Sequence, residues 1–375
     1  MNLPINVLVV DDSPIFSEAI KHILEADKSF RVVGVASHGQ QAVEMTRRLR
    51  PQVITMDVHM PVMDGLAAIE AIMADVPTPI LVVTSDPRAA SGDELHFEAL
   101  RRGALDVFPK PRSWPGTEED RRALREQLRL LSKVTVVRHL AGHRHLWRHA
   151  DQAERGEAQK EEPQTLQRLR ESRPPVIGLG RLVAIVASTG GPAALAKILE
   201  ALPADFAAPI LVTQHIAEGF SASFASWLDD VSPLHVSLAR QGDVLVDGQV
   251  LIAPDGLHMM VTKGGRIALD SSSPVDGHRP SGTPLLASVA SAYGRRGIGV
   301  ILSGMGGDGV KGLEEMRKAG AVTLAQDEAS CVVFGMPKVA LESGAASHSV
   351  PLSEFPRVLC ELVSSEPGGN RTGVS

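Results

Sequence analysis

Short runs of Val, Ile and Leu alternate with amphipathic helical segments up to about Pro111, and this alternation constrains the fold more than any other feature of the sequence. Each run is short and apolar enough to be buried on both faces, which is typical of a parallel sheet with helical crossovers. In the first expected helix, Phe16, Ile20 and Leu24 share one face. The expected strands are Ile5–Val10, Arg31–Ala36, Gln52–Met56, Pro79–Thr84 and Asp106–Phe108. The pattern predicts a five-stranded parallel, doubly wound α/β sheet of the flavodoxin type.

The same alternation resumes from Arg181, after a long polar stretch rich in Arg, Glu, Gln and His. With 375 residues the chain exceeds the length at which one hydrophobic core stops growing, so two domains are expected. The later strands are expected at Leu182–Ala187, Pro209–Thr213, Val250–Ala253, Ile298–Leu302 and Ala321–Ala325. We predict a first domain over residues 1–112, a polar linker or partly helical connector over 113–178, a second α/β domain with a mainly parallel sheet over 179–366 and a disordered tail over 367–375.

Composition excludes several classes of partner and location. A net charge of −6 and an aromatic content of 3% argue against a nucleic-acid-binding surface. The two cysteines, Cys331 and Cys360, cannot form a disulfide framework, and Cys331 is interpreted as a packed thiol without a neighbouring base. The apolar run Val7–Val10 is too short for a signal peptide, and Val176–Ala187 is too short to span a membrane. We therefore expect a cytoplasmic protein without membrane insertion.

Four histidines stand close together in the linker, at positions His139, His143, His145 and His149. Histidine pairs four residues apart can bind a metal. No cysteine or acidic ligand stands among them, and Arg residues surround them, so we interpret them as a solvated helix face.

Acidic and polar side chains follow four of the strands of the first domain. Asp11 and Asp12 follow the first strand, Asp57 the third, Thr84 ends the fourth, and Lys110 follows the fifth. The carboxyl ends of parallel strands meet at one edge of the sheet, so these groups are expected to converge there. Carboxylate oxygens suit Mg²⁺, and a hydroxyl and an ammonium can hold phosphoryl oxygens. An alternative interpretation, helix caps and turn residues, does not account for such groups at four separate strand ends.

This set resembles the receiver domain of bacterial response regulators. The motifs are Asp11-Asp12, Asp57 followed by Met60-Pro61-x-x-Asp64-Gly65, Thr84, and Lys110-Pro111. The resemblance implies that Asp57 accepts a phosphoryl group from a histidine kinase. It also implies Mg²⁺ held by Asp12, Asp57 and the backbone carbonyl of His59, with Asp11 close by. The position three residues before the lysine is often aromatic in receivers, and here it is Val107.

In the second domain, three residue types of a hydrolytic triad stand at strand ends. Ser188 follows the strand Leu182–Ala187 and opens a helix, where free backbone amides can bind an oxyanion. His215 follows the next strand, and Asp308 lies in a glycine-rich loop after a later one. A Ser188 nucleophile, a His215 base and an orienting Asp308 fit this arrangement.

Two other interpretations of these residues remain open from the residues alone. Ser188 and Asp308 also suit helix caps, with His215 as a loop residue. The glycine-rich loops also suit a phosphate cradle, although they lack the Lys of a P-loop and the spacing of a dinucleotide site. A standard α/β-hydrolase is excluded, because Val186 stands where its elbow needs Gly and because the order of the triad differs.

The loops of the second domain resemble those of the CheB methylesterase family. The matching segments are Ala187-Ser188-Thr189-Gly190-Gly191-Pro192, Gln214-His215, Ala253-Pro254, His258-Met259, His278-Arg279-Pro280-Ser281, the loop from Ser303 to Gly309, and Gln326 to Pro337. The resemblance implies hydrolysis of glutamyl methyl esters on methyl-accepting chemoreceptors to glutamate and methanol, and deamidation of receptor glutamines. It implies that Thr189 supports His215, that the backbone amide of Met305 lies near the oxyanion, and that the esterase site needs no cofactor.

One segment departs from the family pattern, since Gly282-Thr283 replaces the expected Val-Asp. We expect this change to remove a carboxylate from the substrate rim and to affect the choice of receptor. We also expect a monomer in which the unphosphorylated receiver covers the Ser188 cleft. The rival function is a non-enzymatic response regulator whose second domain binds receptors or a methyltransferase.

Overall fold

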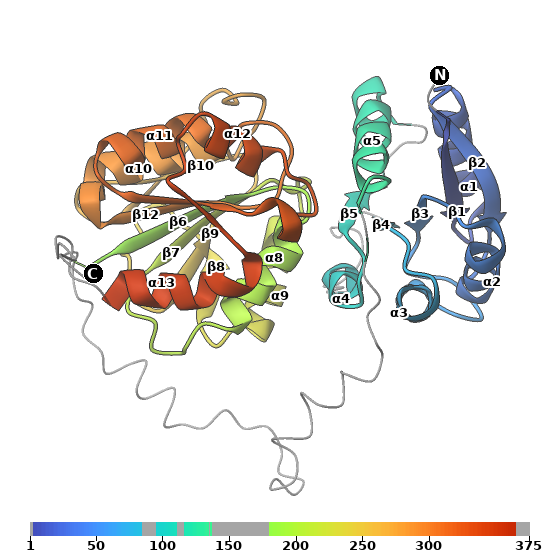
Figure 1. Ribbon diagram of the computed structural model, residues 1–375, viewed down its shortest axis with the longest axis horizontal. Coiled ribbons are helices and arrows are strands. Elements are labelled where there is room, and N and C mark those ends of the chain that lie inside the picture. Colours follow the sequence, from blue (N-terminus) through green and yellow to red (C-terminus); the bar gives the residue numbers. More distant parts are fainter. Residues whose placement is uncertain (1–2, 85–94, 111–115, 135, 137–179, 365–375) are drawn as a thin grey trace, which may run out of the picture.

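The computed structural model describes residues 3–84, 95–110, 116–134, 136 and 180–364. The linker histidines and the expected tail over 367–375 lie outside the described residues. The described helices and strands form two α/β domains, as predicted (Figure 1). No helix in the described part of the chain combines the length and the hydropathy needed to cross a membrane.

The first domain is a five-stranded parallel sheet in the order β2-β1-β3-β4-β5. Its strands are apolar because helices cover both faces, and β3 and β4 are buried along their whole length. The elements are β1 (Ile5–Val10), α1 (Pro14–Glu25), β2 (Phe30–Ala36), α2 (Gly39–Leu49), β3 (Val53–Met56), α3 (Gly65–Asp75), β4 (Ile80–Thr84), α4 (Leu95–Arg101), β5 (Asp106–Pro109) and α5 (Glu118–Leu131). The predicted flavodoxin-type sheet is confirmed.

Helix α5 corrects the expected start of the linker. Residues 113–178 are predicted as a polar linker or partly helical connector, but α5 packs onto the receiver sheet through Leu124, Leu128 and Leu131, which are all buried. Thr117 and Asp120 form a reciprocal capping box at its first turn, which satisfies free backbone amides there. The first domain therefore includes this helix.

The second domain is a seven-stranded, wholly parallel sheet in the order β14-β13-β12-β6-β7-β9-β8, with a separate antiparallel pair β10-β11. Its strands are β6 (Leu182–Ala187), β7 (Ile210–Gln214), β8 (His235–Leu238), β9 (Gln249–Ile252), β10 (His258–Val261), β11 (Ile267–Asp270), β12 (Gly297–Ile301), β13 (Val322–Gln326) and β14 (His348–Val350). Its helices are α8 (Gly191–Glu200), α9 (Ser221–Val231), α10 (Gly282–Tyr293), α11 (Val310–Lys318), α12 (Met336–Glu342) and α13 (Phe355–Ser364), with short 3₁₀ turns at Gly294–Arg296, Glu328–Ser330 and Leu352–Glu354. The predicted α/β fold with a mainly parallel sheet is confirmed.

The two domains meet through α4 and β5 of the first domain, which face α8 and α9 of the second (Figure 1). Phe97 of α4 is fully buried and stacks on Trp227, with ring centroids 5.2 Å apart, and lies 5.4 Å from the ring of Phe224. Buried residues of both domains belong to one continuous hydrophobic cluster. The parallel strands bring the functional loops of each sheet to its carboxyl edge. The contact of α4 and β5 with α8 and α9 holds the first domain against the second.

Candidate functional site

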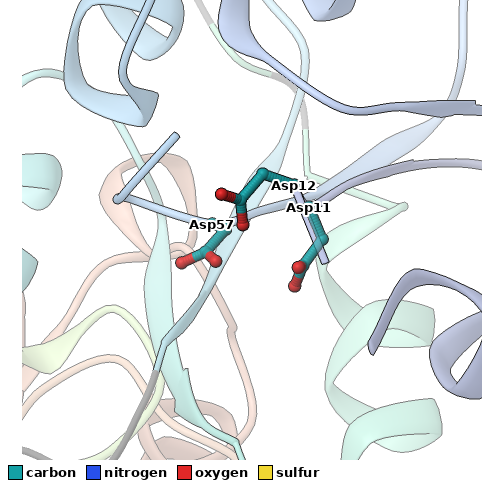
Figure 2. A group of neighbouring side chains, drawn as sticks. All are labelled: Asp11, Asp12 and Asp57. Atoms are coloured by element: carbon teal, nitrogen blue, oxygen red, sulfur yellow. The ribbon is translucent and has the colours of Figure 1, made fainter. Parts of the chain in front are cut away.

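The acidic residues of the first domain converge as predicted. Asp11 and Asp12 follow β1 and Asp57 follows β3, and their ligand oxygens all lie within 4.8 Å of one another (Figure 2). The ammonium of Lys110 lies 2.7 Å from carboxylate oxygens of both Asp11 and Asp57. Asp11, Asp57 and Lys110 are all buried. The buried hydroxyl residue Thr84 ends β4, and its carbonyl oxygen accepts a hydrogen bond from the backbone amide of Lys110.

Three carboxylates against one ammonium leave this pocket net negative. Burial raises the pKa of Asp11, against the hydrogen bond and charge of Lys110. A divalent cation with oxygen ligands would supply positive charge, and the three side chains therefore fit Mg²⁺. His59, whose backbone carbonyl is a predicted further ligand, lies two residues after Asp57 in the loop that follows β3.

Val107 faces the second domain. It lines a small cavity with Phe97 and Asp106 of the receiver and with Pro192 and Phe220 of the second domain. A residue at the position that is often aromatic in receivers therefore lies at the domain contact.

Ser188 and His215 emerge side by side from neighbouring strands. Ser188 directly follows β6 and His215 directly follows β7, and Ala187 pairs with Gln214 in the register of these two strands. The amide of His215 donates to the carbonyl of Ala187 over 2.9 Å. The strand register alone thus brings the predicted nucleophile next to the predicted base.

Asp308 is held by several donors at once. Its carboxylate lies 2.7 Å from Nε2 of His215, 2.5 Å from the hydroxyl of Ser281 and 2.6 Å from the amide of Gly282, and it is buried. Burial alone would raise the pKa of Asp308, but the hydrogen bond and charge of His215 and the donors of Ser281 and Gly282 hold that pKa well below its usual range. Asp308 is therefore ionised at neutral pH.

An ionised Asp308 fixes the tautomer of His215. Nε2 of His215 must carry the proton that is donated to Asp308, which leaves Nδ1 as the acceptor. Nδ1 is buried and has no hydrogen-bond partner among the described residues. It is the nitrogen that can take a proton from a nucleophile.

The imidazole of His278 lies parallel to that of His215, with ring centroids 3.9 Å apart. Burial, with the charge of His215 next, lowers the pKa of His278, so this ring stays neutral. His278 and Ser281 belong to a motif of the family resemblance, which by itself predicts no role for either. Their motif signalled the site, but their contacts with His215 and Asp308 depend on the fold.

The glycine loop after β12 packs directly against Ser188. A Cβ atom at Gly304 would lie 2.6 Å from Cβ of Ser188, so only glycine allows this approach. The amide of Ser188 donates to the carbonyl of Ser303, and the next residues of the loop include Met305, which is exposed. The loop therefore packs against Ser188, and the role expected for the backbone amide of Met305, near the oxyanion, remains a prediction.

Thr189 contacts the receiver. Its hydroxyl and the amide of Gly190 hydrogen-bond to the carboxylate of Asp106 at the start of β5. The role expected for Thr189, support of His215, remains a prediction. Asp106 instead occupies donors at the start of α8, next to Ser188.

Comparison with known proteins identifies both domains. Residues 7–115 match the family model of the response regulator receiver domain, and residues 183–359 match that of CheB methylesterase. A protein of Anaeromyxobacter dehalogenans named protein-glutamate methylesterase/protein-glutamine glutaminase 2 is 46% identical over 359 residues, which covers 96% of this chain and 97% of that protein. The chain belongs to the CheB methylesterase family.

Other CheB relatives extend the likeness. A Myxococcus xanthus protein with the same activity name, numbered 4, is 42% identical over 94% of this chain and 96% of its own length. The crystal structure of the Thermotoga maritima CheB methylesterase catalytic domain is 40% identical and covers 50% of this chain and 100% of that chain, with a TM-score of 0.48. As a CheB-family member the chain is a hydrolase controlled by a receiver, and the rival function without an enzymatic activity is set aside.

Proposed function

We propose that this chain hydrolyses glutamyl methyl esters on methyl-accepting chemoreceptors to glutamate and methanol, and deamidates receptor glutamines. The names of its CheB relatives support this substrate class. The observation that carries the mechanism is the His215–Asp308 pair, because it leaves Nδ1 of His215 without a partner beside Ser188.

In this mechanism the Ser188 hydroxyl gives its proton to Nδ1 of His215 while its oxygen attacks the ester carbonyl. The imidazolium that forms is stabilised by the ionised Asp308. The developing oxyanion faces backbone amides, with that of Met305 as the expected donor. His215 then protonates the leaving methanol, or ammonia from a glutamine. Water, deprotonated by His215, hydrolyses the acyl-enzyme and frees Ser188, so the residues of the esterase site suffice without a cofactor.

The receiver is proposed to control access to Ser188. A histidine kinase is the phosphodonor for Asp57, and Mg²⁺ held by Asp11, Asp12, Asp57 and the carbonyl of His59 supplies positive charge for phosphoryl transfer. The phosphoryl group adds roughly −1.5 to −2 charges where Lys110 now contacts Asp11 and Asp57. Thr84 and Lys110 are expected to hold its oxygens.

Occlusion is supported by the domain contact. Asp106, Val107 and Phe97 all lie on α4 and β5 and contact the second domain near the start of α8. Since Lys110 follows β5 directly, a change in its contacts acts on the strand that carries Asp106 and Val107. Phosphorylation thus shifts the equilibrium between a closed and an open arrangement of the two domains. The size of the shift is the difference between the interaction free energies of the phosphoryl group in the two arrangements.

The chain is further proposed to act as a cytoplasmic monomer that does not bind nucleic acid, in keeping with its net charge and its two cysteines.

The test is methanol release from methylated receptor membranes, with and without a small-molecule phosphodonor. Ser188→Ala should abolish release, and Asp57→Asn should abolish the response to the phosphodonor. Ser353→Ala, which changes an exposed serine of the same domain, is the matched control and should behave as wild type. Full activity in Ser188→Ala would refute the nucleophile, and an intact response in Asp57→Asn would refute the switch.

A further inference from the structure

The segment Gly282-Thr283, where this chain departs from the family pattern, lies against Asp308. The hydroxyl of Thr283 donates to Oδ1 of Asp308 over 3.1 Å, and its amide donates to the same oxygen over 3.3 Å. The Thr283 side chain is thus directed at the residue that orients His215. The expected effect of this departure on the choice of receptor remains a prediction.

Thr283 also connects Asp308 to the next residue of the chain. The amide of Gly309 donates to the hydroxyl oxygen of Thr283 over 3.0 Å. Gly309 has a φ of +83° and lies at the N-cap of α11. One hydroxyl thus holds both the carboxylate of Asp308 and the backbone turn that carries it.

Asp308 lies at the N-terminus of α10, a helix of 12 residues capped by Ser281. Gly282 and Thr283 occupy its first turn, so their amides have no partner within the helix and donate to the carboxylate, where the helix dipole also favours negative charge; the Thr283 amide is shared with the hydroxyl oxygen of Ser281. Glycine at 282 allows the close approach, because a Cβ atom there would lie 2.4 Å from a methyl carbon of Val186. Asp308 thus accepts four hydrogen bonds from Ser281, Gly282 and Thr283, and three of them go to Oδ1, the oxygen that is not bonded to His215.

We propose that Thr283 is a positioning residue, which holds Asp308 ionised and aligned and thereby sets the proton affinity and orientation of His215. The inference rests on the proposed roles of Ser188, His215 and Asp308. Each donor to Asp308 draws negative charge away from Nε2 of His215. The Thr283 bond therefore limits how strongly the pair binds a proton, and it keeps His215 free to act as a base.

The titratable and charged groups around His215 are Asp308 and the stacked His278, and Asp276 faces His278. Asp276 itself is paired with Lys311 over 3.3 Å. None of these groups contacts the Thr283 hydroxyl except Asp308, so a substitution at Thr283 acts on His215 through Asp308.

The experiment compares Thr283→Val, which removes the hydroxyl at nearly constant volume, with Thr283→Ser, which keeps it. In the full chain, Thr283→Val should lower the plateau of kcat for methanol release about tenfold, a change of about 1.4 kcal/mol that suits one hydrogen bond to a charged group. The acidic limb of the pH–kcat profile of Thr283→Val should move to higher pH. Without the Thr283 hydroxyl, more negative charge remains on Asp308 near His215, and this charge stabilises the imidazolium. KM should stay unchanged, and Thr283→Ser should restore both quantities.

Thr323→Val is the matched control, since Thr323 is a buried, hydrogen-bonded threonine on β13 of the same domain. It should leave both the plateau and the limb unchanged. The inference is overturned if Thr283→Val keeps the wild-type plateau and limb, or if Thr283→Ser is as impaired as Thr283→Val.

An NMR titration of His215 in the full chain, assigned with His215→Gln, separates this inference from the proposed function. A His215 pKa that rises in Thr283→Val and returns in Thr283→Ser supports the coupling even if Ser188→Ala remains active. An unchanged His215 pKa overturns the coupling even if Ser188→Ala is inactive.

Discussion

Replacing Phe97 by alanine tests whether the domain contact restrains the esterase. Phe97 belongs to α4 of the receiver, and both of its ring contacts, with Phe224 and Trp227, are made to α9 of the second domain. Phe97→Ala removes both stacking contacts without touching Ser188 or Asp57. It should therefore shift the chain from the closed toward the open arrangement.

The size of the shift follows from the two ring pairs. Each aromatic pair is worth about 0.5–1.5 kcal/mol beyond the burial of its surface. The two pairs together give about 1–3 kcal/mol, which corresponds to a change of about 5- to 150-fold in the ratio of closed to open chains. The loss of buried surface adds to this value, so it is a lower bound.

The assay is methanol release without a phosphodonor and at saturating phosphodonor. Basal release should rise toward the phosphorylated rate, and the stimulation factor should fall in proportion, because the open state is the same in both cases. The control is Phe30→Ala, since Phe30 is equally a buried phenylalanine of the receiver but packs within it, with the Arg129 guanidinium 5.2 Å from its ring. A folded Phe97→Ala chain with wild-type basal release and wild-type stimulation would show that the contact does not restrain catalysis.

Two further predictions follow from individual side chains. Burial, against the hydrogen bonds of Val107, Gln127, Thr189 and Gly190, raises the pKa of Asp106 to about 6, so the proton that it binds stabilises the folded chain. This contribution is fully present below the usual pKa of 3.8 and is lost as the pH rises through about 6. The unfolding midpoint of the wild type relative to that of Asp106→Asn should therefore fall as the pH rises from about 5 to about 7.5, and a difference that does not change with pH would contradict the linkage. Burial, with the charges of Asp327 and Glu328, raises the pKa of Cys331 to about 12, so about one thiol in ten thousand is ionised at pH 8. Iodoacetamide should therefore label Cys331 in the folded chain far more slowly than in an unfolded control, and rapid labelling of the folded chain would refute this.

The parts of the fold that could be predicted from the sequence are those whose signal is local. The buried strands are short apolar runs bounded by polar residues, and β6 was predicted with its observed bounds, Leu182–Ala187. The two edge strands of the second sheet give no such signal. In β8 and β14 exposed positions interrupt the apolar pattern, because one side of an edge strand has no neighbour, and neither strand was predicted.

Helix α5 could not be assigned to the first domain for a related reason. It buries only a narrow stripe, and the remaining positions are mostly Arg, Glu and Gln, so its composition resembles a linker. The spacing of Leu124, Leu128 and Leu131 by four and then three residues was the available signal.

The candidate sites were predicted in part because parallel strands bring their carboxyl ends to one edge. That rule is enough to bring Asp11 near Asp57 and Ser188 near His215. It does not say which way a side chain points. The turn of Thr283 toward Asp308, the stacking of His278 on His215 and the contact of Asp106 with Thr189 depend on packing between elements far apart in the sequence.

The continuous hydrophobic cluster that joins the two domains also sets a condition on the active state. In the closed chain Phe97, Phe224 and Trp227 cover one another, and no water contacts most of their surface. In the proposed open arrangement the two halves of that cluster separate, which leaves aromatic surface on both. Exposed apolar patches favour association with other apolar surfaces and cost solubility. We therefore expect the chain to be least soluble when it is most active, and a short-lived phosphoryl group would limit the time that it spends in that form.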